Sequence, residues 1–369
     1  MNDKKIRAVI IGFAHMHVNE VALYIHNEPD MELVAVADTK PDIKEIPETR
    51  YTRAWNMENV RTNYCSNFYE DYREMLDEVK PEIAFILCET SKKPEVVNEC
   101  AKRKVNVSIE KPMAYSLEEA KKIEKVVDEN GIFAMVNWPL TWRGYLHTVK
   151  NLIDSEKLGK ILKIRFLIGN TGPLGRGAMH RGVNGSAEEM SDNEKASLWW
   201  YRKSESGGAI LDFCCYGCLL TSWYNTQEPE YAYTQGVNLA HPFSDILDNG
   251  IAVVKYPSSV SILEGTWTTP SCGIPAGPSV YLSDGVIECV REDDRVIVKA
   301  YDIYGNPVEV TEATLDEKFK NIASMYAHHV KTGEPVHETL DFKNNMKIMA
   351  LLDSVARSTE SGCREQVTL

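Results

Sequence analysis

The sequence lacks any run of about 18 apolar residues, the length that a membrane-spanning helix needs, so we expect no transmembrane segment. It also lacks an excess of basic residues, because 41 Lys and Arg stand against 54 Asp and Glu, for a formal charge of -13. Nucleic acids and anionic membranes bind to positive faces, so neither is an expected partner. The first residues contain no signal-peptide core, and we expect a cytoplasmic protein.

Cysteine is scarce: the 369 residues include nine cysteines, an odd number, scattered along the sequence. This distribution is not typical of the disulfide framework of a secreted protein. Cys215-x-x-Cys218, with Cys214 beside it, would suit a redox or zinc pair, but a four-cysteine site needs a second close pair that the sequence does not contain. We expect most of these thiols to be buried. The composition, 43% hydrophobic and 26% charged, is typical of a globular protein long enough for two domains.

Short apolar runs alternate with helix-like stretches through the first 137 residues, a pattern that predicts a parallel sheet with helices on both faces. We therefore expect an α/β Rossmann domain, which binds a dinucleotide, over residues 1–137. The apolar runs lie at 6–11, 32–37, 83–88, 105–109 and 133–136, and the helix-like stretches at 18–27, 71–80, 93–103 and 117–129.

The pattern changes after residue 137 to alternating strands with few helices between them, which predicts an α+β domain with a large, mostly antiparallel open sheet over 138–369. We expect this domain to bind substrate and to form a homo-oligomer, a dimer or higher, because a sheet face left bare by the helix at 209–224 needs a covering subunit. Residues 170–197 have no clear period and are predicted to form a functional loop. The strands are expected at 161–169, 231–239, 251–256, 259–267, 279–282, 286–290 and 296–300.

The turn after the first strand is a candidate pyrophosphate site. Gly12, Ala14 and His17 occupy the three glycine positions of the fingerprint G-x-G-x-x-G, and His15 lies between them. Glycine permits a tight turn and a close approach of the backbone to phosphate at a helix N-terminus. Only the first glycine is present, so the motif is weak by itself.

Asp38 strengthens this interpretation, since it ends the second strand 26 residues after Gly12. An acid at that position accepts the ribose hydroxyls of NAD and repels the additional phosphate of NADP. A solvated aspartate at a strand end would give the same pattern, and Lys40 nearby keeps NADP as an alternative cofactor.

Two further clusters carry chemistry. Glu110-Lys111-Pro112 directly follows the predicted strand at 105–109 and so lies at the carboxyl edge of the sheet, where such folds bind ligands. In the second half, Asp212 and Tyr216 are four residues apart and share one face if 209–224 is a helix. A surface ion pair before a loop would resemble the first cluster.

In these features the chain resembles the Gfo/Idh/MocA oxidoreductases, the family of glucose-fructose oxidoreductase and inositol dehydrogenase. The resemblance implies a catalytic group of Lys111, Asp212 and Tyr216, and cofactor contacts from the turn, Asp38 and Glu110. Most members have His where this chain has Tyr216, although glucose-fructose oxidoreductase also has Tyr. The motifs that carry the resemblance are Gly12, Asp38, Tyr69-Glu70-Asp71-Tyr72, Glu110-Lys111-Pro112-Met113-Ala114, Arg143, Leu158-Gly159-Lys160-Ile161, Gly207-Gly208 through Tyr216 and Ser354-Val355-Ala356-Arg357-Ser358.

The residue types suit oxidation of an alcohol, which needs a base for the hydroxyl proton while hydride leaves the same carbon. We expect Tyr216 to be the acid/base, with a pKa lowered by Lys111. Aromatic residues near these segments favour a sugar or polyol, because sugar C–H faces stack on aromatic rings. The expected substrate contacts are Lys111, Trp138, Arg143, His180, Asp212 and Tyr216, with Arg181 as a further candidate.

The predicted function is NAD(P)-dependent oxidation of a secondary hydroxyl of a sugar, glycoside or polyol. Two alternatives remain: redox-neutral, NAD-dependent glycoside cleavage, and a regulatory protein that binds nucleotide without catalysis. His15-x-His17 after a strand also resembles the metal pair of amidohydrolase barrels, but no eight-strand βα repeat follows it. We expect no bound metal.

Overall fold

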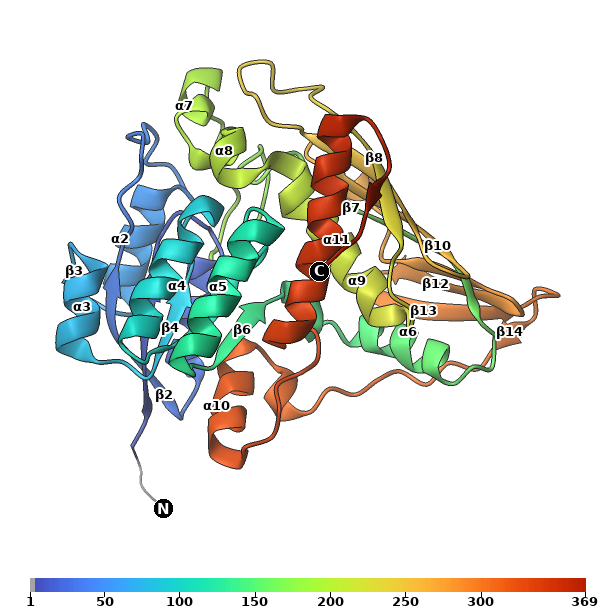
Figure 1. Ribbon diagram of the computed structural model, residues 1–369, viewed down its shortest axis with the longest axis horizontal. Coiled ribbons are helices and arrows are strands. Elements are labelled where there is room, and N and C mark those ends of the chain that lie inside the picture. Colours follow the sequence, from blue (N-terminus) through green and yellow to red (C-terminus); the bar gives the residue numbers. More distant parts are fainter. Residues whose placement is uncertain (1–3) are drawn as a thin grey trace.

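Two β-sheets lie side by side in the computed structural model, which describes residues 4–369, and helix α11 (Phe342–Ser361) packs between them (Figure 1). The strands of the first sheet are β1 (Ile6–Ile11), β2 (Met31–Ala37), β3 (Phe68–Tyr69), β4 (Ile83–Ile86), β5 (Asn106–Glu110) and β6 (Ala134–Asn137). Their order is β3-β2-β1-β4-β5-β6, and all neighbours are parallel. The predicted Rossmann arrangement is confirmed. Ligands of such sheets bind at the carboxyl ends where the strand order reverses, here between β1 and β4.

Helices connect these strands and cover the sheet. They are α1 (Val18–Asn27), α2 (Arg53–Asn63), α3 (Tyr72–Val79), α4 (Lys93–Lys102) and α5 (Leu117–Asn130). Right-handed crossovers on the two sides of β1 place α1 with α2 on one face and α4 with α5 on the other. The ends of α5 follow its sequence signals, because the Ser116 hydroxyl accepts a hydrogen bond from Glu119 N and Gly131 ends the helix with a φ of 61°.

The second sheet has nine strands and is mixed but mostly antiparallel, as predicted. The strands are β7 (Ile161–Gly169), β8 (Tyr231–Val237), β9 (Asn249–Lys255), β10 (Val260–Thr266), β11 (Ser279–Leu282), β12 (Gly285–Glu292), β13 (Arg295–Asp302), β14 (Pro307–Val308) and β15 (Glu365–Gln366). They follow the order β14-β13-β12-β11-β7-β10-β9-β8-β15. Among the described residues, β7 and β10 form the parallel pair within this sheet.

Helix α9 (Cys215–Tyr224) covers one face of the second sheet together with α11, and α6 (Gly144–Asp154) packs beside β13. A π-helical turn, η4 (Ile210–Cys214), precedes α9, so the predicted helix at 209–224 has two parts. The other face exposes apolar side chains. Those on β8 and β9 are Tyr233, Val237, Ile251 and Val253.

The segment from 170 to 201 packs over the turn that follows β1, and its side chains form a second apolar cluster there. It contains a short helix, α7 (Asp192–Ala196), and is followed by α8 (Lys203–Ser206); α10 (Ile322–Thr332) lies against α1. No helix within residues 4–369 has the length and apolar character that crossing a membrane requires. The short 3₁₀ segments are η1 (Thr90–Lys92), η2 (Pro139–Trp142), η3 (Trp199–Tyr201), η5 (Ser271–Gly273) and η6 (Glu317–Phe319).

Candidate active site

Lys111 lies just beyond β5 at the carboxyl edge of the parallel sheet, where it meets two residues of the second half. Its Nζ donates to Asp212 Oδ1 at 2.7 Å and to the Asp212 carbonyl at 3.1 Å. The same Nζ lies 4.6 Å from the centre of the Tyr216 ring. The structure therefore brings together the three residues that the resemblance implied, although Lys111 and Asp212 are 101 positions apart in the sequence.

Asp212 is held from both sides. Its Oδ2 accepts a hydrogen bond from the Trp267 indole N–H at 3.0 Å, while Oδ1 receives Lys111. It lies in η4, which begins after Gly207-Gly208, and a Cβ on Gly208 would come within 2.5 Å of the Leu247 carbonyl oxygen. Only glycine permits this approach. With both carboxylate oxygens engaged, Asp212 orients the Lys111 ammonium.

Tyr216 differs from the sequence-based expectation in its acidity. Burial raises the pKa of its phenol far above the ordinary value, and the Lys111 ammonium only partly opposes this effect. Burial lowers the pKa of Lys111, but Asp212 more than compensates, so the net pKa lies well above its ordinary value. The expectation that Lys111 lowers the Tyr216 pKa overall is therefore wrong. At neutral pH the phenol keeps its proton and the ammonium keeps its charge.

A cavity of about 350 Å³ opens over these residues, a volume within the usual range for small-molecule sites. Its walls come from both halves of the chain, because the β1 turn, the segment after β6 and the loop at 170–182 all contribute. The polar residues that line it are His15, His17, Glu20, Lys111, Arg143, Asn170, His180, Arg181, Asp212, Tyr216 and Ser271.

The remaining predicted substrate contacts divide into two groups. Arg143 and His180 line the cavity, and the His180 ring bonds the Pro173 carbonyl through Nε2 at 3.0 Å. Burial lowers the His180 pKa to about 4, so the ring is neutral near pH 7. Trp138 lies behind Tyr216, with ring centres 5.6 Å apart, and its indole N–H donates to Asn345. It supports the Tyr216 ring from the core.

The two histidines of the β1 turn have different hydrogen-bond partners. His15 Nδ1 accepts a 3.2 Å hydrogen bond from the backbone N–H of His17, and the His17 Nδ1 lies 3.0 Å from Glu110 Oε1. Glu110 is fully buried, and its Oε2 accepts a hydrogen bond from Asn137 Nδ2 at 2.9 Å. His15, His17 and Glu110 each present a ligand atom within 4.8 Å of the others, but His17 and Glu110 are bonded to each other.

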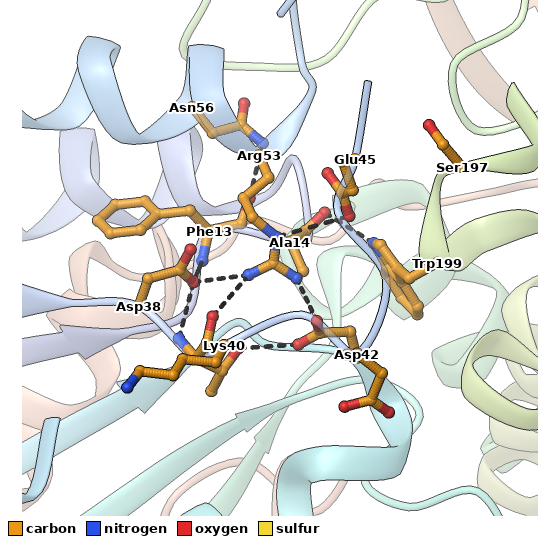
Figure 2. A network of polar contacts seen from close by, with 12 residues as sticks. Phe13, Ala14, Asp38, Lys40, Asp42, Glu45, Arg53, Asn56, Ser197 and Trp199 are labelled. Carbon is orange, nitrogen blue, oxygen red and sulfur yellow. Dashed lines mark hydrogen bonds and ion pairs between the residues drawn. The ribbon is translucent and has the colours of Figure 1, made fainter. Parts of the chain in front are cut away.

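Asp38 directly follows β2, close to its predicted place at the end of the second strand, but it belongs to a cluster that the sequence did not reveal (Figure 2). Its Oδ1 accepts hydrogen bonds from Phe13 N at 3.0 Å and from Arg53 at 2.8 Å. The Arg53 guanidinium also bonds Glu89 and lies 3.5 Å from Glu45. Three carboxylates thus surround one buried guanidinium.

The residues along the carboxyl edge of the first sheet determine whether a dinucleotide fits there. A Cβ on Gly12 would lie 2.4 Å from Cys88 N, so the tight turn requires its glycine. Beside Asp38 a cavity of about 250 Å³ is lined by Thr39 and Lys40, and the larger cavity lies over Lys111 at the other end. The residues at both ends therefore fit an adenosine and a nicotinamide.

The centre of this path is covered in the conformation described here. The Trp199 indole N–H donates to the Ala14 carbonyl at 2.9 Å, and Ala14 is only 3% exposed. Arg53 lies on the same side, against Asp38 (Figure 2). A dinucleotide that spans both cavities would have to pass the contact between Trp199 and Ala14.

Sequence reasoning missed Arg53, Glu89, Trp267 and the pairing of His17 with Glu110. Arg53 and Glu89 are 36 positions apart in the sequence, and no periodic pattern indicates an ion pair between residues so widely separated. The apolar character of residues 259–267 located the strand that precedes Trp267, but not the partner of its indole. The buried thiols agree with expectation, since six of the nine cysteines are buried, including Cys214, Cys215 and Cys218.

Two family models match most of the chain, one over each β-sheet region. Residues 6–138 match the model of an oxidoreductase family with an NAD-binding Rossmann fold, and residues 146–287 match the GFO/IDH/MocA C-terminal domain. An uncharacterized oxidoreductase of Bacillus subtilis, YrbE, is 21% identical over 257 residues, which cover 68% of this chain and 63% of that protein. The chain thus spans somewhat less than two thirds of that relative.

Solved structures share the fold over nearly the full length. The aldose-aldose oxidoreductase of Caulobacter crescentus, in complex with glycerol, has a TM-score of 0.75 at 13% identity and covers 98% of this chain and 100% of its own. The WlbA dehydrogenase of Bordetella pertussis, in complex with NADH and UDP-GlcNAcA, has a TM-score of 0.74 at 17% identity, with 99% and 100% covered. The two family matches, with the sheets arranged as found here, show that the chain belongs to the GFO/IDH/MocA oxidoreductases, a family with an NAD-binding Rossmann fold.

Proposed function

We propose that this protein oxidises a secondary hydroxyl of a sugar, glycoside or polyol, with NAD as the hydride acceptor. The observation that carries this proposal is the meeting of Lys111, Asp212 and Tyr216 at the floor of one cavity. Asp38, at the far end of the same sheet edge, supports NAD over NADP because its carboxylate would repel a 2′-phosphate. When bound, the nicotinamide supplies the electron-pair acceptor.

Lys111 binds and polarises the substrate oxygen in this proposal. An ammonium group has three N–H donors, and Asp212 takes two of them, which leaves one for a ligand. A positive charge held in a largely buried site stabilises a developing alkoxide more strongly than one in water. Asp212 positions the ammonium, and Tyr216 donates its hydroxyl proton in a hydrogen bond to the substrate.

The cavity favours a hydroxylated ligand. It presents Arg143, Arg181 and three imidazoles to the ligand, and aromatic and apolar side chains complete the wall. Such a mixture suits sugar rings, which carry hydroxyl groups at the edge and C–H groups on the faces. Solved relatives that share the fold bind glycerol in one case and UDP-GlcNAcA in another.

We further propose that the chain divides into a dinucleotide-binding domain, 1–137, and a substrate-binding domain, 138–369, since β6 ends at Asn137. The exposed apolar face of β8 and β9 would pair with a second copy in a cytoplasmic homo-oligomer.

A substrate screen tests the function. The purified protein is first checked for copurified nucleotide by its absorbance, and then incubated with NAD or NADP and a panel of aldoses, sugar acids, glycosides and polyols. Net formation of NADH is the expected result. Release of an aglycone without net NADH would favour glycoside cleavage, and nucleotide binding without any turnover would favour a regulatory protein; each contradicts the proposal.

A further inference from the structure

The three residues at the cavity floor lack a group that readily accepts a proton near neutral pH. The pKa of Lys111 and that of Tyr216 are both raised, so these side chains hold their protons. The carboxylate oxygens of Asp212 are both bonded, one to Lys111 and one to Trp267. Oxidation of an alcohol nevertheless requires that the hydroxyl proton leave. The other titratable side chains that line the cavity, besides its two arginines, are His15, His17, His180 and Glu20.

His17 faces the same cavity and is backed by a buried acid. Its Nδ1 lies 3.0 Å from Glu110 Oε1, and Glu110 is fully buried with its other oxygen bonded to Asn137. Because a carboxylate accepts the Nδ1 proton, the neutral ring presents its Nε2 lone pair away from Glu110. A carboxylate that orients a histidine and stabilises its charged form is the arrangement that proton-transferring histidines use.

We propose that His17, oriented by Glu110, accepts the hydroxyl proton of the substrate in the oxidation that we assign to this site. The inference rests on that proposed function. The O–H proton would pass to His17 Nε2 as the C–O bond becomes a carbonyl. Bound NAD⁺ would supply the acceptor for the hydrogen that leaves the carbon with both bonding electrons, so that the alcohol is oxidised and NAD⁺ is reduced. The new imidazolium stays beside the Glu110 carboxylate until it loses its proton to water.

The charges around His17 set the pH at which it works. Burial lowers its pKa, but Glu110 and, more weakly, Glu20 more than offset that effect, so the net pKa is raised from 6.5. Lys111 opposes protonation from the cavity floor, and His15 and His180 repel a charged ring from the turn and the loop. The amino end of α1 also disfavours a positive charge. Oxidation needs the neutral ring, so its rate should fall as the pH drops below the His17 pKa.

The position of His17 explains two departures from the family pattern together. His17 stands where the fingerprint has its third glycine, and Tyr216 stands where most members have histidine. An imidazole is thus absent from α9 and present at the N-cap of α1, in the lining of the same cavity. The side chain that interrupts the glycine motif would supply the missing base.

Three variants test the inference. We expect His17→Gln to lower kcat for oxidation by about 10²- to 10⁴-fold with little change in KM, and to abolish the acid limb of the pH profile. Glu110→Gln removes the negative charge and should shift that limb to lower pH. His26→Gln, at the other end of α1, is the matched control and should leave both kcat and the limb unchanged.

A readout without turnover accompanies these rates. Imidazole resonances recorded against pH should show the His17 ring titrating above its ordinary pKa in the wild-type protein and lower in Glu110→Gln. Unchanged titration in Glu110→Gln would contradict the pairing.

Other outcomes separate the two proposals. If the wild-type protein oxidises a substrate and His17→Gln retains its kcat and its acid limb, the role of His17 is wrong while the proposed function stands. If no substrate supports NADH formation, the proposed function fails first. If a chelator abolishes activity and added Zn²⁺ restores it, His15, His17 and Glu110 hold a cation and the proton-transfer role is overturned.

Discussion

Arg53 and Lys111 are both buried cations at the carboxyl edge of the same sheet, but their surroundings differ. Arg53 meets three carboxylates, from Asp38, Glu45 and Glu89, and its NH1 also donates to the Thr39 carbonyl at 3.1 Å. Lys111 meets one carboxylate and lines a cavity. A cation surrounded by carboxylates of its own chain holds structure together, whereas one that lines a cavity and is paired with a single carboxylate is available to a ligand.

The contrast between Arg53 and Lys111 predicts that substitution of Arg53 has the largest effect on the free energy of unfolding. Arg53→Met leaves Asp38, Glu45 and Glu89 without their common counter-charge. Since breaking a buried ion pair costs about 3–5 kcal/mol, we expect the free energy of unfolding in urea to fall by at least that amount. Arg50→Met, three residues earlier and more exposed, should change it by less than about 0.5 kcal/mol. Equal effects of the two substitutions would show that the cluster contributes no stability.

Lys111→Met should affect catalysis more than stability. Removing a charge that stabilises an alkoxide costs about 10²- to 10³-fold in kcat. The unfolding free energy should fall by less than in Arg53→Met, because a single carboxylate is left, it keeps the Trp267 N–H, and water from the cavity can reach it. Steady-state kinetics and urea titration measure the two quantities, with Lys121→Met on the exposed side of α5 as control. A larger loss of stability than in Arg53→Met would reverse the comparison.

The smallest effect is expected at Asp38, which pairs with Arg53 and is also the proposed contact of the cofactor ribose. Its Oδ1 accepts hydrogen bonds from Phe13 N, Thr39 N and the Arg53 guanidinium, which leaves Oδ2 for a ribose hydroxyl. Asp38→Ala should reduce the ratio of kcat/KM for NAD to that for NADP by about tenfold, or ~1.4 kcal/mol. Asp42→Ala should leave the ratio as it is. If the ratio also stays constant in Asp38→Ala, this carboxylate serves Arg53 alone.

The features that could be predicted from the sequence are those that depend on neighbouring residues. The apolar run at 6–11 and the signals at Ser116 and Gly131 act on neighbouring residues, so they locate β1 and α5 closely. The motif around Lys111 could be placed at the sheet edge because the strand before it was identified. Its juxtaposition with Tyr216 depended on the family resemblance.

The remaining features depend on distant partners. Helix α2 buries only Arg53, Asn56 and Val60, so its sequence has little of the apolar periodicity that indicates a helix. The acidity of Tyr216 depends on a balance between burial and the charge of Lys111, and the sequence reveals the charge but not the burial. Contacts across more than 100 residues, such as Trp199 with Ala14, have no local signature.

The contact between Trp199 and Ala14 has a thermodynamic consequence for nucleotide affinity. If only a fraction of molecules has this contact open at any moment, the apparent dissociation constant equals the intrinsic one divided by that fraction. A substitution that loosens the indole would then tighten cofactor binding without adding a single new contact to the cofactor. Nucleotide affinity would then depend on a tryptophan from the second half of the sequence as well as on the turn itself.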